Sequence, residues 1–90
     1  MKVNLYGTVY RPEYEDTLLW SGELDCVPRK DDLVFPFDGW GGQRVTRVYW
    51  NLEKKPSVEI FIDDKNGEYS RQAKDLGITE TKPTKTGKGR

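Results

Sequence analysis

Alternation of apolar and polar residues is the feature that most constrains the fold of this chain. In residues 2–10 apolar side chains fall on one parity and polar or tyrosine side chains on the other. In residues 58–63, Val58, Ile60 and Ile62 alternate with Glu, Phe and Asp in the same way. A period of two puts every second side chain on one face of an extended backbone. Both segments therefore predict half-buried β-strands.

Three more strands are predicted over residues 18–26, 33–35 and 43–52. Gly22 lies inside the first of these and indicates a bend or bulge, which a small barrel needs at its corners. Val45 and Val48 lie on opposite parities of the last strand. One extra residue near Thr46 or Arg47, a β-bulge, would let both valines face the core.

The segment after the fifth strand predicts a turn and then a short helix. Residues 63–67 read Asp-Asp-Lys-Asn-Gly, and Asn-Gly tolerates the positive φ of tight turns. Ser70 would cap a helix over residues 71–76, and Gly77 would end it. The alternative is that residues 68–70 pair back as a short strand.

Five strands without long helices between them predict a mainly β, antiparallel meander. One small helix could not cover a flat five-stranded sheet, so we expect the sheet to curl into a partly open barrel of SH3-like or OB-like type. An open sheet packed by the C-terminal helix is the competing arrangement. Only 34% of the residues are hydrophobic, so residues 1–78 form a single domain with a small core, and residues 79–90 a flexible, disordered basic tail. The expected core is Val3, Leu5, Trp20, Leu33, Val48, Trp50, Ile60 and Ile62.

Part of this pattern resembles a known group of proteins. The run Val27-Pro28-Arg29-Lys30-Asp31-Asp32-Leu33-Val34 is followed by a glycine turn and two core strands. Over residues 24–62 this is similar to small SH3-like β-barrel proteins of bacteria and phages that carry a VPR-x-GD-x-V segment. Asp31 stands where that pattern usually has glycine. The resemblance implies the fold and little about function, since most members have no assigned activity.

The formal net charge of zero conceals an uneven distribution. Residues 1–80 carry fifteen acidic against eleven basic residues, a net charge of −4, and the last ten residues carry +4. An acidic body disfavours binding to duplex nucleic acid, which needs clustered positive charge. The single cysteine, Cys26, and the lack of a signal peptide or a long apolar run predict a cytoplasmic protein without a membrane segment, located in the host cytoplasm if phage-encoded.

Catalytic chemistry has few candidates here. The chain has no histidine, which removes the common nucleophile systems and the commonest transition-metal ligand. Three carboxylate pairs, at residues 15–16, 31–32 and 63–64, lie at turns or strand ends, where turn geometry explains them. We therefore expect a protein that is not an enzyme and that has no cofactor, metal site or catalytic residue.

Two features indicate binding. Trp40 lies among Gly39, Gly41 and Gly42, so it either folds back over the open end of the barrel or stands out as an anchor for a partner. The second feature is a possible mixed aromatic and basic surface. It forms only if the first and fourth strands are close; otherwise its residues are scattered over a solvated face. Its candidate residues are Tyr6, Tyr10, Arg44, Arg47 and Tyr49.

The leading hypothesis is a non-enzymatic protein-binding module of the adaptor or inhibitor type, one form of which is a phage-encoded inhibitor of a host defence system. The alternative is a small barrel that binds nucleic acid through the aromatic-basic surface and the basic tail. An exposed strand edge would also allow a homodimer by strand addition.

Overall fold

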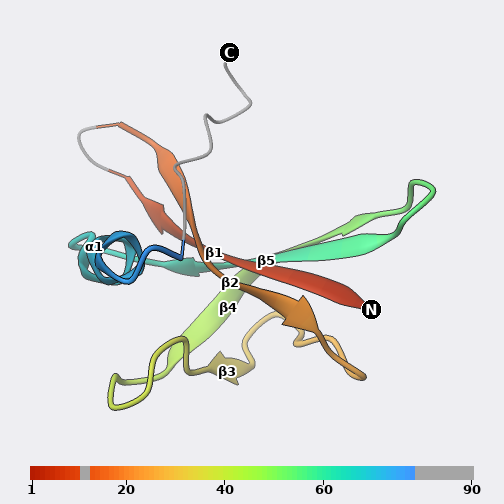
Figure 1. The fold of residues 1–90 in the computed structure, drawn as a ribbon, viewed down its shortest axis with the longest axis horizontal. Coiled ribbons are helices and arrows are strands. Elements are labelled where there is room, and N and C mark those ends of the chain that lie inside the picture. The colour runs from red at the N-terminus through yellow and green to blue at the C-terminus, as the bar shows by residue number, and fades with distance from the viewer. Residues whose placement is uncertain (11–12, 79–90) are drawn as a thin grey trace.

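The protein is described by a computed structural model, which places residues 1–10 and 13–78. Five strands and one helix follow each other along the chain: β1 (Lys2–Val9), β2 (Glu15–Glu23), β3 (Leu33–Val34), β4 (Gln43–Asn51), β5 (Ser57–Asp63) and α1 (Glu68–Asp75). They form one sheet in the order β2-β1-β5-β4-β3, curled into a half-barrel (Figure 1). The predicted mainly β, partly open barrel with one short C-terminal helix is therefore confirmed. The predicted tail, residues 79–90, lies outside the described residues.

The strand pairing is mixed, and the prediction of a wholly antiparallel sheet is wrong for one pair. β1 pairs in parallel with β5, with Leu5 opposite Ile60. β1 and β2 form an antiparallel hairpin, and β4 and β5 form another. The second hairpin lies on the other side of β1 from β2, with β5 next to β1. Alternation along single strands does not encode which neighbour a strand chooses.

The bulge in β4 is confirmed, and a second bulge lies in β2. Pairing of β4 with β5 shifts between Val45 and Arg47, and Val45 is fully buried while Val48 packs against the core. In β2 the register shifts so that Leu5 pairs with Trp20 and Tyr6 with Leu18. The extra residue between them, Leu19, is fully buried.

The core has a different membership from the predicted one. Four of its expected members are buried: Val3, Leu5, Ile60 and Ile62. The prediction is wrong for three other residues, because the exposed fraction is 36% for Trp20, 52% for Leu33 and 54% for Trp50. Leu19, Val45, Val58, Phe37, Tyr69 and Ala73 complete the core instead.

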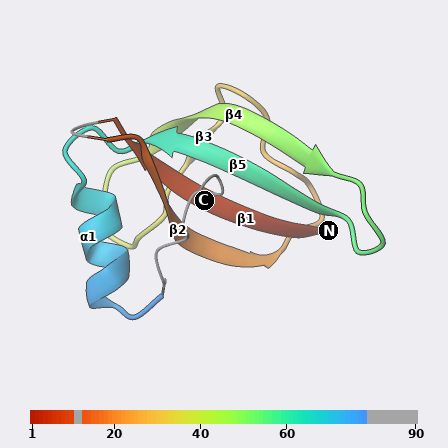
Figure 2. The same ribbon diagram turned by 90° about the horizontal axis from the view of Figure 1, so that it is seen from above.

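Helix α1 lies against one end of the sheet, beside β2 (Figure 2). It begins earlier than predicted, after Gly67 with φ of 72°, and Ser70 is not its cap. The buried carboxylate of Asp64 accepts hydrogen bonds from the backbone N–H groups of Tyr69 (3.1 Å) and Ser70 (2.8 Å) and from the Ser70 hydroxyl (2.6 Å). An acidic side chain in the preceding turn thus satisfies the first turn of the helix.

The predicted helix end is confirmed. Gly77 adopts φ of 72°, its N–H donates to the carbonyl of Lys74, and the N–H of Ile78 donates to the carbonyl of Ala73, both at 3.0 Å. These two bonds form a Schellman motif. Within the described residues, no helix is long and apolar enough to cross a membrane.

Candidate functional site

Trp40 folds back onto the domain. Its ring packs edge-on against Tyr69, with centroids 5.0 Å apart, and against Phe37 at 5.4 Å, and it is partly buried. Its backbone N–H donates to the carbonyl of Phe37. Of the two predicted conformations, the inward one is observed, since the flanking glycines leave the ring free to turn inward. A role of Trp40 in partner binding stays a prediction.

Arg44 lies apart from the other predicted binding residues. Its side chain is exposed, and Nη1 donates to the backbone carbonyl of Asp31 at 2.9 Å. Asp31 has φ of 77°, a left-handed conformation that non-glycine residues seldom adopt. The observed role of Arg44 is to hold the turn before β3.

The aromatic and basic residues predicted on β1 and β4 do come together, on the outer face of the sheet. β5 lies between these two strands and adds Phe61, whose ring stacks on Tyr6 at 5.3 Å and meets Tyr49 edge-on at 5.3 Å. Arg47 lies over Phe61, with its guanidinium carbon 4.3 Å from the ring centroid. We call Tyr6, Arg47, Tyr49 and Phe61 the outer-face cluster.

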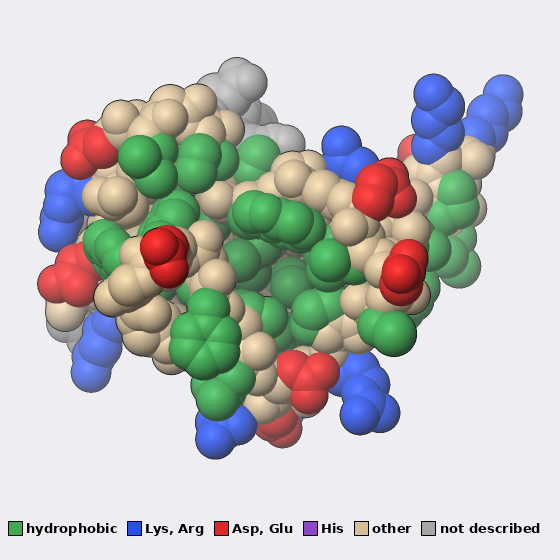
Figure 3. Space-filling model, turned by 60° about the horizontal axis from the view of Figure 1, so that its bottom comes forward, with side chains coloured by type: hydrophobic (Ala, Val, Ile, Leu, Met, Phe, Trp, Pro, Cys, Tyr) green, Lys and Arg blue, Asp and Glu red, His purple; other side chains and the backbone are tan. Residues whose placement is uncertain are grey.

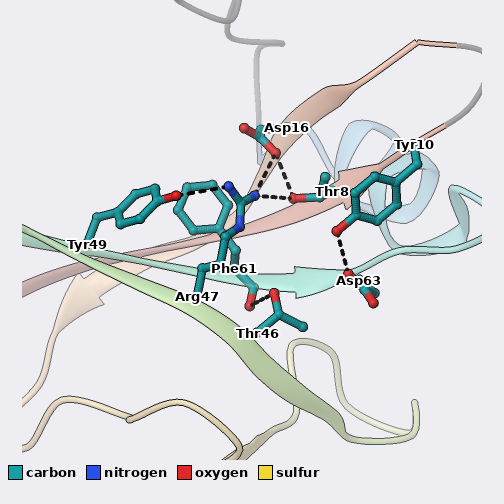
Figure 4. A network of polar contacts seen from close by, with 8 residues as sticks. All are labelled: Thr8, Tyr10, Asp16, Thr46, Arg47, Tyr49, Phe61 and Asp63. Atoms are coloured by element: carbon teal, nitrogen blue, oxygen red, sulfur yellow. Dashed lines mark hydrogen bonds and ion pairs between the residues drawn. The ribbon is translucent and has the colours of Figure 1, made fainter.

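Polar partners hold Arg47 in place (Figure 4). Its guanidinium donates to the Tyr49 hydroxyl (3.1 Å) and to the Thr8 hydroxyl (3.2 Å), and it lies 3.8 Å from the carboxylate of Asp16. Partial burial works against its charge, but the Tyr49 hydrogen bond and the nearby Tyr14, Tyr49 and Asp16 outweigh it and raise the pKa of Arg47. The cation is therefore already paired within the domain.

The phenol groups of Tyr6 and Tyr10 both have a raised pKa. Burial, with the charges of Glu59 and Asp16 adding to it, raises the pKa of Tyr6 to about 12. Tyr10 donates a hydrogen bond to Asp63 at 2.8 Å, and chiefly this bond raises its pKa to about 12. Burial at Tyr6 and the hydrogen bond of Tyr10 thus favour the protonated form of each phenol.

A hollow of about 530 Å³ lies beside the start of α1, lined by Tyr10, Gln43, Asp63, Asp64, Lys65, Asn66, Glu68 and Tyr69. Two of its polar side chains serve the fold, since Asp64 holds the first turn of the helix and Tyr69 donates to the carbonyl of Gly41. Among the described residues, no group of three or more His, Cys, Asp or Glu side chains could hold a metal ion.

Sequence reasoning missed an apolar groove on the open side of the half-barrel. The groove has a volume of about 320 Å³ and is lined by Leu5, Trp20, Leu24, Pro28, Val34, Phe35, Pro36 and Ile60. Hydrophobic side chains gather over this hollowed face (Figure 3). The signal in the sequence is the run Phe35-Pro36-Phe37. The sequence predicts that Phe35 ends the third strand, whereas β3 ends at Val34.

The two aromatic rings of the groove are supported by glycines. A Cβ added at Gly42 would lie 2.8 Å from the ring of Phe35, and one at Gly22 would lie 2.8 Å from the ring of Trp20. Each ring therefore packs directly on a glycine backbone. Phe35 stays 66% exposed and Trp20 36% exposed, although both are held in position. Gly22 is thus a support for Trp20, and the predicted bulge of this strand lies at Leu19 instead.

Comparison of the chain with protein-family models, with curated proteins and with solved structures finds no match. The resemblance to small SH3-like barrels therefore stays a prediction.

Proposed function

We propose that this chain is a non-enzymatic module that binds another protein through the apolar groove. The observation that carries the proposal is the pair of exposed, glycine-supported rings, Phe35 and Trp20, beside a 320 Å³ apolar hollow. Large apolar side chains exposed together mark interaction surfaces on small domains. Rings that are already held in place lose little freedom on binding, which favours affinity.

The chemistry of the groove favours a protein over a small molecule. Of its lining side chains, the Trp20 indole alone can hydrogen-bond, and none is charged. Small-molecule sites place several converging polar groups in an apolar pocket to orient the ligand. An apolar side chain projecting from a partner protein needs no such groups. The adaptor or inhibitor role suggested by the sequence is part of this proposal.

The nucleic-acid alternative has less support. Arg47 is paired with Asp16, and Glu59 and Asp63 lie on the strand that runs through the outer-face cluster. These carboxylates oppose the phosphate contacts on which nucleic-acid affinity depends. We expect no retention of single-stranded DNA or RNA in filter binding at low salt, and retention that falls steeply with salt would favour the alternative.

Affinity capture with matched variants tests the proposal. The immobilised full chain, Phe35→Ser and Leu76→Ser are compared on lysate of the native host. Leu76 is 57% exposed and lies at the end of α1, outside the groove, so it serves as the control. A protein retained by the wild type and by Leu76→Ser is then purified and titrated by calorimetry.

We expect Phe35→Ser to weaken that binding about tenfold or more, as loss of an aromatic anchor does, and Leu76→Ser to change it less than about twofold. Equal affinity of all three proteins for every purified partner would exclude the groove as the binding site.

A further inference from the structure

The outer edge of β4 is open over most of its length. Among the described residues, β3 pairs with this edge only at Gln43 and Arg44. Beyond β3, the N–H of Val45 donates to the carbonyl of Asp32, and the carbonyl of Val45 accepts from the N–H of Asp31. Within the described residues, no further backbone group is bonded to the edge over residues 46–51. Alternation along the strand, counted from Val45 through the bulge, turns the N–H and C=O groups of Val48 and Trp50 to this open side.

Beyond the bulge, this edge also lacks the charges and prolines that usually prevent strand addition. Residues 48–52 contain no charge and no proline, and Trp50 is 54% and Leu52 77% exposed. Natural edge strands are normally protected by charges, prolines or short length. Beside the edge, a hollow of about 300 Å³ lies between Val48 and Trp50 on one side and the segment 27–30 on the other.

The other edge of the sheet, β2, is protected against pairing with itself. It carries acidic residues at both ends, Glu15 and Asp16 at one and Glu23 at the other. Two copies of β2 paired antiparallel about Leu19 would set Glu15 directly opposite Glu23, and like charges opposite each other are destabilising.

We propose that a second copy of this chain pairs with the open edge, β4 against β4, antiparallel about a two-fold axis at Trp50. Such an axis presents the same edge to both partners, so each Val48 and Trp50 finds backbone partners on the other copy. Trp50 then lies opposite Trp50 of the second copy, and Val48 lies opposite Leu52. The hollow beside each edge has room for the apolar side chains of the other copy.

Charge complementarity supports this occupant and this register. The pairing leaves the charged turn at residues 53–55 just beyond the last backbone partners, since β4 ends at Asn51. It also brings Lys54 and Lys55 of one copy to the end of the edge where Asp31 and Asp32 of the other lie. These last four side chains are exposed, and none has an ion pair among the described residues.

This inference goes beyond the proposed function, because the dimer uses the β4 edge and the partner uses the groove. The test measures the mass of the full chain by light scattering and sedimentation from about 1 to about 200 µM, a range that covers micromolar dissociation constants. Trp50→Lys and Trp50→Glu are measured alone and as an equimolar mixture, with Phe35→Ser as the control. Far-UV circular dichroism checks the fold of each variant.

We expect the measured mass of the wild type and of Phe35→Ser to rise with concentration, from 10.4 kDa towards twice that value. Each Trp50 variant alone stays monomeric, because two like charges then face each other at the axis, and the mixture regains the dimer. A wild type that stays monomeric, a Trp50→Lys variant that still dimerises, or a mixture that stays monomeric overturns the proposal. Dimerisation lost in Phe35→Ser also overturns it and would assign the contact to the groove.

Cross-linking gives a second measurement that does not depend on charged variants. Trp50→Cys in a Cys26→Ser background places the introduced thiols opposite each other at the axis, within disulfide reach for paired strands. Mild oxidation is expected to give a covalent dimer. Leu76→Cys in the same background stays monomeric. Equal cross-linking of the two variants would contradict the β4 interface.

Discussion

Asp64 is the single side chain on which the docking of α1 depends most. It is 1% exposed, and its carboxylate accepts three hydrogen bonds, from the N–H groups of Tyr69 and Ser70 and from the Ser70 hydroxyl. Loss of a helix cap costs about 0.5–2 kcal/mol, and each hydrogen bond to a charged group contributes about 1.5–3 kcal/mol. Since water can enter part of the vacated space, we expect Asp64→Ala to lower the free energy of unfolding by about 3 kcal/mol.

For a domain of this size, about 3 kcal/mol corresponds to a fall in Tm of about 12–24 °C. Urea titration followed by circular dichroism gives the free energy, and calorimetry gives Tm. Asp64→Asn keeps one oxygen acceptor, so its free energy of unfolding should fall by about half as much. The neighbouring Asp63 is exposed and accepts a hydrogen bond from Tyr10, so Asp63→Ala should cost less than about 1 kcal/mol. An Asp64→Ala protein within about 0.5 kcal/mol of wild type would refute the conclusion that Asp64 stabilises the first turn of α1.

Three further predictions follow from single contacts. The pKa of Tyr6 is raised from 10.0 to about 12 in the folded state, which favours the protonated form. The free energy of unfolding is therefore unaffected by Tyr6 below pH 10 and falls as the pH rises from 10 to 12. Tyr6→Phe should reduce that fall, as measured by urea titrations across this pH range. Asp31→Gly should raise the free energy of unfolding by about 0.5 kcal/mol, because glycine accepts φ of 77° without strain, and a loss of stability would contradict this. Gly42→Ala should displace the ring of Phe35, changing the near-UV circular dichroism and weakening partner binding, whereas Gly41→Ala, whose added Cβ meets nothing within 4 Å, should change neither.

The local structure was predictable because it depends on neighbours in the sequence. Alternation located the strands, and the parity conflict between Val45 and Val48 located the bulge in β4. Gly77 marked the end of α1 through its tolerance of positive φ. The outer-face cluster was predictable in part, since parity placed Arg47 and Tyr49 outward before their contacts were known.

Other features depended on contacts between distant segments. Trp50 and Trp20 share the parity of core residues, yet the half-barrel leaves one side open and both remain exposed. Trp40 turns inward because Phe37 and Tyr69 meet it there.

By itself, then, the sequence determined which residues are extended, where the chain turns and which side chains share a strand face, because backbone geometry is set over a few residues. The tertiary structure alone decided that β5 lies parallel to β1, that the barrel stays open over an apolar groove, and that the edge of β4 is left without a partner. These depend on how strands far apart in the chain choose their neighbours, and alternation looks the same for every choice.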